Sequence, residues 1–422
     1  MRHLPDHRPV LGRAGLLLFC ALSIGSSEAA GQSELEAAVR DPAVEAALSK
    51  LADNRAATAD LLVRIGGIIS PSGDELERAT AVAEHMRTIG LDSVRVTGDP
   101  NAIGVIPGRS GRALVFVSTL DDLVTVAEHQ RASGRPPRIE GSRVVGPGTN
   151  TSLTTAAMLA AAEVYLRSGR TPEHTLVFAA VAQEETGLRG MKALYAEYRS
   201  WTDAFVDILG DGHSISYGAL GIHWWRVVAE GPPGHTLNGG LPNVNQAIAR
   251  AVDRILAHPA ASRTDDTRTR LNIAMLQSGA VFNHKPETGW FSLDIRSMEA
   301  DIIDGIESDV REILREVSAE TTILLAMEEF QITPGGRIPG ARDSRLVRTS
   351  EAISQRLGYE PSLSESGSAN LNVAIGAGTP AIGLGGSRGG ERGEPGEWAD
   401  IDGMMRTAEH VLLLAVVLGG RS

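Results

Sequence analysis

The stretch 177-VFAAVAQEETGLRGM-191 decides how the rest of the chain is interpreted. Its first half is a short, continuous apolar run, partly β-branched, which predicts a strand buried on both faces of a sheet. The run leads into Glu184 and Glu185, and in open α/β sheets ligands bind at the carboxyl ends of the strands. Adjacent carboxylates repel each other unless a cation or a proton lies between them. A solvated loop with two glutamates is the alternative, but Gly187 and Gly190 favour a constrained turn.

The composition sets limits on the class of protein. A chain of 422 residues is long enough for about two domains. Its net charge of −12 argues against binding to nucleic acid or to an anionic membrane surface. Cys20 is the only cysteine and lies in an N-terminal apolar run, so the mature chain is expected to have no disulfide, thiolate ligand or cysteine nucleophile.

Residues 1–29 are predicted to be a signal peptide. Arginines precede the apolar run 16–24, and a cleavage-like site follows at residues 27–29. The apolar run is too short to span a bilayer as a stable helix. We therefore expect a periplasmic or secreted protein with no membrane association after cleavage.

The rest of the chain alternates strands and helices, and each strand ends in polar residues, which predicts a largely parallel α/β sheet flanked by helices. We expect this domain to comprise residues 30–220 and 336–422. Between them, residues 221–335 follow a β-α-β-β-α-β order, typical of a ferredoxin-like α+β unit. The sequence therefore predicts a sheet domain with an inserted, lid-like domain.

At this point the chain resembles a known family, the zinc-dependent exopeptidases and deacylases of metallopeptidase family twenty, which includes peptidase T, glutamate carboxypeptidase and aminoacylase. The motifs that carry the resemblance are, in chain order, PSGDE at 71–75, TLD at 119–121, GPG at 146–148, EETGLRG at 184–190, GHT at 234–236, Asn283 with Pro286, and DIRS at 294–297. The resemblance implies a zinc exopeptidase-like fold, a lid domain that forms a homodimer, and a small peptide or N-acyl amino acid as substrate.

The resemblance also implies roles for individual residues. Glu184 matches the general base, while Glu185 and Asp211 match two ligands of the family's dinuclear zinc site. Asp121 matches the carboxylate that orients a histidine ligand. The remaining ligand positions hold poor zinc ligands, namely Thr119, Thr151 (or Asn150), Asn370 and Gly393. His213 is the only nearby replacement that the sequence offers.

Glu185 and Asp211 alone do not meet the needs of zinc, which takes about four N, O or S ligands. No cofactor is therefore expected, although the resemblance implies zinc. The charge of the remaining carboxylates needs another solution. One is protonation of Glu184 or Glu185. The other is a guanidinium, because Arg388 and Arg392 lie in the loop where the family places its late histidine.

In the lid, three residues match the family's substrate-contacting positions. By resemblance, His235 supplies an oxyanion-hole donor across the dimer interface. Asn283 and Arg296 hold the substrate carboxylate. The alternatives are a turn-capping role for His235 and an ion pair within the lid for Arg296.

Two functions remain open at this stage. The first is an exported hydrolase homologue that acts on a carboxylate-bearing peptide or N-acyl amino acid, with Glu184 as acid/base and little or no metal. The second is a catalytically inactive homologue that binds a small ligand or acts as a dimeric scaffold.

Overall fold

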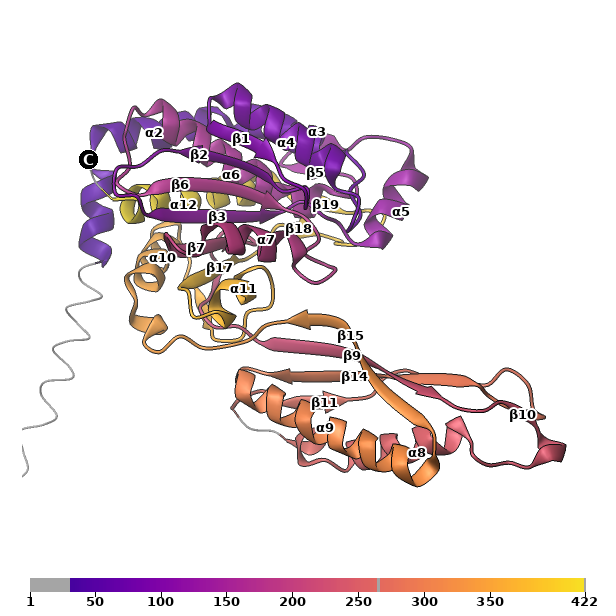
Figure 1. Ribbon diagram of the computed structural model, residues 1–422. Coiled ribbons are helices and arrows are strands. Elements are labelled where there is room, and N and C mark those ends of the chain that lie inside the picture. Colours follow the sequence, from indigo (N-terminus) through magenta and orange to yellow (C-terminus); the bar gives the residue numbers. More distant parts are fainter. Residues whose placement is uncertain (1–30, 264–265, 421–422) are drawn as a thin grey trace, which may run out of the picture.

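The computed structural model describes residues 31–263 and 266–420 (Figure 1). The predicted signal peptide lies outside these residues. The larger domain contains an eight-stranded sheet in the order β1-β2-β6-β3-β7-β17-β8-β16. Its strands are β1 (Asp92–Val96), β2 (Ala102–Ile106), β3 (Ala113–Thr119), β6 (Thr175–Val181), β7 (Thr202–Ile208), β8 (Ser214–Ser216), β16 (Ser362–Ser364) and β17 (Ala381–Gly385).

The four central strands, β6, β3, β7 and β17, run parallel to one another. β2 joins β6 in antiparallel pairing, and β8 joins β17 in the same way. Because β6, β3 and β7 are adjacent and parallel, their carboxyl ends lie together at one edge of the sheet. This arrangement confirms the prediction of a mostly parallel α/β sheet.

The apolar runs of β3 and β6 are continuous because both faces of the sheet are covered. On one face, the rings of Phe116 and Phe178 stack with centroids 5.4 Å apart within the larger apolar core. On the other face, Val115 and Val177 belong to a smaller core that includes residues of two helices, α7 and α11. The helices of this domain are α2 (Pro42–Asp53), α3 (Arg55–Gly66), α4 (Leu76–Ile89), α5 (Val124–Ser133), α6 (Thr149–Arg167), α7 (Arg189–Tyr198), α10 (Arg345–Arg356), α11 (Leu371–Gly376) and α12 (Ile401–Leu418).

A small antiparallel sheet connects distant loops at the edge of this domain. It has the order β18-β19-β5-β4. Its strands are β4 (Arg138–Glu140), β5 (Arg143–Val145), β18 (Gly389–Gly390) and β19 (Trp398–Asp400). The pairing of β19 with β5 fixes residues 389–400 beside the start of α6.

The lid is a separate antiparallel sheet with two helices on one face. The order is β11-β14-β9-β15, with β12 also paired to β14, and a separate antiparallel pair of short strands, β10 and β13, forms the tip. The elements are β9 (Gly221–Glu230), β10 (Gly234–His235), α8 (Val244–Leu256), β11 (Arg270–Asn272), β12 (Leu276–Ser278), β13 (His284–Lys285), β14 (Thr288–Ser297), α9 (Ala300–Thr321) and β15 (Leu324–Thr333).

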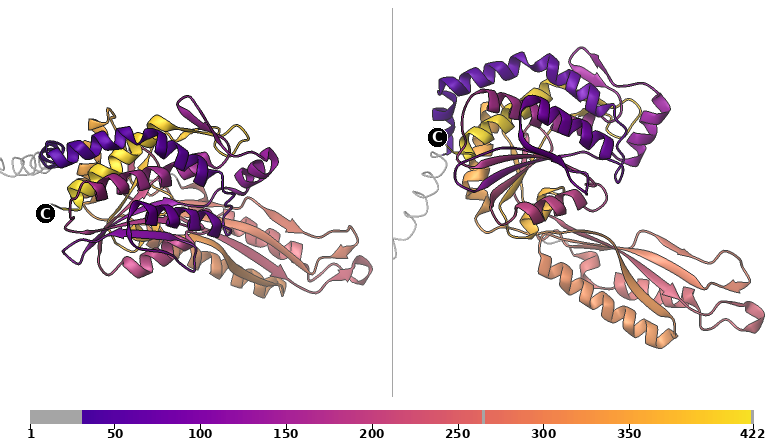
Figure 2. Two further views of the ribbon diagram at one scale, coloured as in Figure 1. Left: turned by 90° about the horizontal axis from the view of Figure 1, so that it is seen from above. Right: turned by 45° about the horizontal axis from the view of Figure 1, so that its top comes forward.

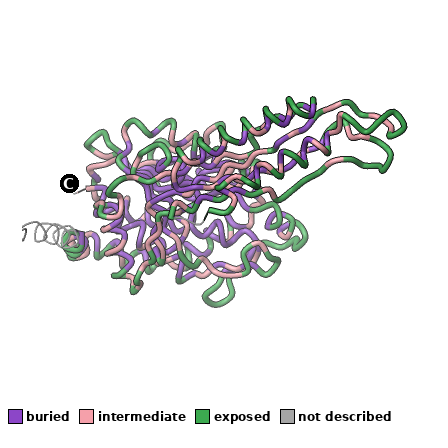
Figure 3. The backbone as a smooth tube through the Cα atoms, turned by 90° about the horizontal axis from the view of Figure 1, so that it is seen from below, coloured by how far each residue is buried: buried purple, intermediate pink, exposed green. Residues whose placement is uncertain are grey.

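The lid projects away from the sheet domain, and β10 lies at its far end (Figures 1 and 2). Buried backbone is concentrated in the sheet domain, whereas the loops at the lid tip are exposed (Figure 3). In the described ranges, no helix is both long enough and apolar enough to cross a membrane.

Candidate active site

The glutamate pair lies in a tightly held loop between β6 and α7. The backbone N–H groups of Glu184 and Glu185 donate to the two oxygens of Asp121, at 2.9 and 3.0 Å. Asp121 is 1% exposed and follows β3, the neighbour of β6. The preceding N–H, that of Gln183, donates to Glu75 Oε1 at 3.0 Å. Asp121 therefore orients the loop that carries the pair.

The surroundings of Glu184 oppose its ionisation. Burial raises the pKa of Glu184 to about 8, and the negative charges of Glu185, Asp121 and Asp207 add to this shift. The pKa of Glu185 is also raised by burial, although Arg392 and Arg388 oppose that rise. Near neutral pH, Glu184 is therefore mostly protonated, as one of the two sequence-based solutions predicted.

The second predicted solution, a guanidinium, is present in the same site. Arg392 Nη2 donates to Glu185 Oε1 at 3.2 Å. Arg388 is partly buried and interacts electrostatically with Glu184, Glu397 and Asp207. Both arginines come from the loop around β18, where sequence reasoning placed them. The hypothesis that an arginine pairs with Glu185 is confirmed.

Asp207, which sequence reasoning missed, is the carboxylate of β7 that interacts electrostatically with Glu184. It is 1% exposed, accepts from Leu371 N at 3.0 Å, and burial raises its pKa to about 7. Asn370 Nδ2 donates to Thr119 Oγ1 at 3.1 Å and lies 3.5 Å from Asp207 Oδ1. An aspartate within the apolar run 204–209 (AFVDIL) was the signal that could have found it.

Asp211, the carboxylate favoured from the sequence, lies in different surroundings. Its Oδ2 accepts from the Tyr359 hydroxyl at 2.8 Å and lies 3.5 Å from Arg406 Nε. Its backbone oxygen is 3.3 Å from Nδ1 of the buried His410. His213, the proposed substitute ligand, approaches Asp211 at 3.7 Å and packs on Tyr359. The structure therefore places Asp207, rather than Asp211, beside Glu184, because β7 ends before residue 211.

Glu397 closes the site on the side of α6. Its Oε1 accepts from the N–H groups of Gly148 and Asn150, at 2.9 and 3.0 Å. Its Oε2 accepts from Gly393 N at 3.0 Å. A carboxylate at a helix N-terminus is stabilised by the helix dipole and by unpaired N–H groups. Glu397 therefore ties the arginine-bearing loop to α6, at the position where the resemblance expected a bridging aspartate.

The donors present do not fit a pair of zinc ions. The positions expected to hold ligands are occupied by Thr119, Asn370 and Gly393, and Glu185 already accepts from Arg392. Guanidinium groups beside the carboxylates would repel divalent cations. In the described part of the chain, no group of three His, Cys, Asp or Glu side chains is arranged to hold a metal ion.

The three predicted lid residues are not brought together with Glu184. His235 and Asn283 contact each other at the lid tip, with His235 Nε2 3.1 Å from Asn283 Nδ2. His235 also caps a turn, because its Nδ1 accepts from Leu237 N at 3.1 Å. Arg296 lies near the opposite end of β14, where its Nε donates to Asp294 Oδ1 at 2.9 Å. Both alternatives considered from the sequence, a capping role and a lid ion pair, are therefore present.

The fold and this loop architecture agree with comparisons to known proteins. The model for peptidase family M20/M25/M40 matches residues 122–416. The chain belongs to this family. The M20 assignment confirms the resemblance drawn from the motifs. No curated protein matches the sequence significantly.

Solved structures of several peptidases share the fold of this chain. An aminopeptidase T from Bacillus cereus is 20% identical with a TM-score of 0.71, and the match covers 86% of this chain and 99% of that one. A tripeptidase from Staphylococcus aureus is 18% identical with a TM-score of 0.71, covering 87% and 99%. A dinuclear metal-binding M20 peptidase from Bacillus subtilis is 14% identical with a TM-score of 0.62, covering 89% and 99%. The TM-scores establish a common fold.

Proposed function

We propose that this M20 protein hydrolyses a small carboxylate-bearing amide, either a peptide or an N-acyl amino acid, with Glu184 as acid/base and arginines in place of zinc. The observation that carries the proposal is the contact of Arg392 Nη2 with Glu185 Oε1 at 3.2 Å. This contact supplies positive charge beside the carboxylate loop from within the chain. The family membership supports an amide as the bond that is cleaved.

The proposed chemistry uses groups already placed in the site. Ionised Glu184 takes a proton from the water that attacks the amide carbon, and then gives that proton to the leaving nitrogen. The guanidinium of Arg388, which donates no hydrogen bond to a described residue, stabilises the negative charge that develops on the carbonyl oxygen. The products are a carboxylate and an amine, so atoms and charge balance. A base with a pKa near the working pH suits both halves of this cycle.

The test compares the wild type with Glu184→Gln on a panel of dipeptides and N-acyl amino acids, together with metal analysis of both proteins. Removal of a general acid/base should lower kcat about 10²- to 10⁴-fold. Glu394→Gln, an exposed residue of the Arg392 loop, is the matched control and should retain full activity. Two tightly bound zinc ions per chain, or equal activity of Glu184→Gln and the wild type, would refute the proposal.

One observation favours a second function, a binding protein without catalysis. Arg392 donates to Glu185, and two backbone N–H groups donate to Asp121. These carboxylates therefore already have hydrogen-bond partners within the chain. The same panel separates the two functions. Saturable binding of an N-acyl amino acid without turnover, in both the wild type and Glu184→Gln, would establish the binder.

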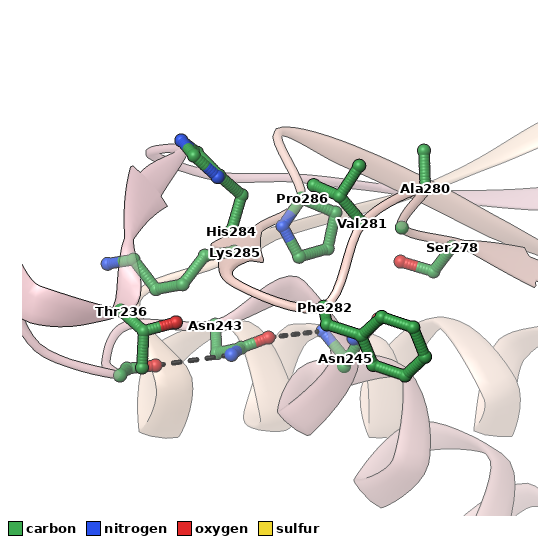
Figure 4. Close-up of a pocket in the computed structure, with 12 residues that line it drawn as sticks. Thr236, Asn243, Asn245, Ser278, Ala280, Val281, Phe282, His284, Lys285 and Pro286 are labelled. Carbon is green, nitrogen blue, oxygen red and sulfur yellow. Dashed lines mark hydrogen bonds between the residues drawn. The ribbon is translucent and has the colours of Figure 1, made fainter.

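We also propose that a second copy of the chain covers the lid tip. Phe282 and Leu237, which are close in sequence to Asn283 and His235, are fully and almost fully exposed to solvent. A cavity of about 430 Å³ adjoins Phe282 and Lys285 (Figure 4). Exposed apolar clusters mark interaction sites. Within one chain, His235 belongs to β10, at the end of the lid remote from the sheet domain (Figure 1), so in this proposal the imidazole reaches the glutamate loop of a partner copy.

Light scattering of the purified protein tests this assembly. The wild type should have the mass of a dimer, and Phe282→Asp should shift it toward the monomer without a loss of folding. Leu76→Asp, which changes a similarly exposed apolar residue of the sheet domain (60% exposed), should leave the dimer intact. A wild-type protein that remains a monomer at micromolar concentration would contradict the proposal.

We further propose that the protein is exported to the periplasm or beyond. The support is the N-terminal pattern of arginines, a short apolar run and a cleavage-like site within residues 1–29. Fractionation of a bacterial expression host, with mass spectrometry of the N-terminus, tests this. A cytoplasmic protein that retains its first 29 residues would overturn it.

A further inference from the structure

The lid sheet has one face covered by helices and one open face. Along β14, Phe291, Leu293 and Ile295 are buried in the lid core, where α8 and α9 pack. The alternating residues Trp290 and Asp294 point to the opposite face because side chains alternate along a strand. An aromatic side chain on an open face is notable in a chain in which only 4% of the residues are aromatic.

The open face contains an apolar pocket of about 350 Å³. It is lined by Trp224, Arg226, Met275, Trp290, Asp294 and Phe330, among others. Trp224 lies opposite Asp294 in the register of β9 and β14, so the two share this face. The guanidinium carbon of Arg226 lies 4.6 Å from the ring centroid of Trp290 and 6.0 Å from that of Phe330. The walls are therefore flat surfaces suited to stacking.

The pocket lies on the side of the lid that meets the Glu184 loop. Gln331 pairs with Trp224 across β15 and β9, and therefore shares the open face. A Cβ placed on Gly187, two residues after Glu185, would lie only 3.8 Å from Gln331 Cγ. Lys192 of α7 also donates to the Ile332 carbonyl at 3.0 Å. Gln331 is therefore a neighbour both of Trp224 and of the turn that carries the glutamate pair.

We propose that this pocket binds an aromatic group of the substrate, so that the amides taken by the enzyme carry an aryl acyl group or an aromatic side chain; the inference rests on the proposed function. An aromatic ring fits between indole, phenyl and guanidinium surfaces, which attract it by stacking and cation–π contact. The volume is at the lower end of that of small-molecule sites.

The charge at the pocket suits an anionic substrate. Arg226 is exposed and makes no ion pair with any described residue, although Glu328 lies opposite it in register. Asp294, by contrast, is already paired with Arg296. Of the charged residues that line the pocket, Asp294 is thus already paired, whereas the Arg226 guanidinium, stacked on Trp290, is available to the carboxylate of an aromatic amide.

Tryptophan fluorescence tests the proposal without requiring turnover. The purified full-length protein is titrated with N-(2-naphthoyl)glycine and, as the matched aliphatic probe, with N-acetylglycine. Trp224 and Trp290 line the pocket and report its occupation. We expect saturable quenching by the naphthoyl compound, with at least tenfold tighter binding than for the acetyl compound.

Phe330→Ser should weaken naphthoyl binding roughly three- to tenfold, the loss expected for one aromatic contact. Phe330 is 63% exposed, so its replacement should not impair folding, and Met275→Ser, at 54% exposed, is a second variant of the same kind. Leu76→Ser, at 60% exposed in the sheet domain, is the matched control and should bind as the wild type does.

Equal affinity for the two probes, or unchanged binding in both pocket variants, would overturn the inference. A change in molecular mass caused by Phe330→Ser would also overturn it, because a second copy would then be the occupant. Aromatic selectivity in a protein that hydrolyses neither probe would refute the hydrolase proposal while leaving the binding pocket established.

Discussion

Replacing Glu184 with glutamine should make the stability of the protein less dependent on pH. Burial and neighbouring carboxylates raise the pKa of Glu184 from 4.5 to about 8. Between these values the folded protein retains a proton that the unfolded chain has released, so the wild type loses stability as the pH rises toward 8. Glutamine cannot ionise. From pH 6 to pH 9, the stability of Glu184→Gln relative to the wild type should therefore increase by roughly 2–3 kcal/mol.

Urea unfolding at pH 6, 7, 8 and 9, followed by circular dichroism, measures this difference. Most of the gain should appear between pH 6 and pH 8, the range in which the folded wild type still holds its proton. Glu128→Gln is the control, because this glutamate is exposed on α5 and forms no ion pair with the described residues. A difference between Glu184→Gln and the wild type that stays constant within about 0.5 kcal/mol would refute the reasoning. It would mean that Glu184 is ionised throughout, with a stronger cation beside it.

Three further perturbations follow from the same geometry. Arg392→Gln removes an ion pair in which the arginine side chain is 46% exposed, so the free energy of unfolding at pH 8 should fall by at most about 1 kcal/mol. At pH 4, where Glu185 is protonated, the melting temperature should be the same as that of the wild type. Arg78→Met leaves the buried Asp122 without the guanidinium that lies 2.7 Å from it, and should lower the free energy of unfolding in urea by about 3–5 kcal/mol. The double variant Arg78→Met with Asp122→Leu should recover most of this loss. Gly393→His places a side chain at φ +85° and should destabilise by about 1 kcal/mol, and an unchanged unfolding midpoint would contradict this.

The sheet was predictable because its strands are buried on both faces. The continuous apolar run in β6, followed by polar residues, carries that information in adjacent letters of the sequence. Arg392 was predicted for another reason, because the family resemblance placed its loop at the site. The lid's helices and strands were predicted from amphipathic and apolar segments for similar reasons.

The details that cannot be read from adjacent residues depend on distances between elements. Asp207 and Asp211 both belong to the end of one strand in the sequence, and only the register of β7 against β3 shows which carboxylate lies beside Glu184. The separation of His235 from the glutamate loop depends on the direction of the lid, which no short motif encodes. The shared face of Trp224 and Trp290 likewise follows from strand register.

The balance of charge in the site follows from how its cations are held. A divalent metal ion bound by several ligands supplies two positive charges, whereas the Arg392 guanidinium supplies one, through a partly exposed contact of modest strength. The remaining negative charge must then be removed by protons, and the pKa values of Glu184 and Asp207, about 8 and about 7, place both groups where they exchange protons near neutral pH. If arginines act in place of metal, as proposed, the ionisation of the site depends on pH over the range in which Glu184 would act. If catalysis uses ionised Glu184 as the base, kcat/KM should rise up to tenfold per pH unit below pH 8 and level off above it.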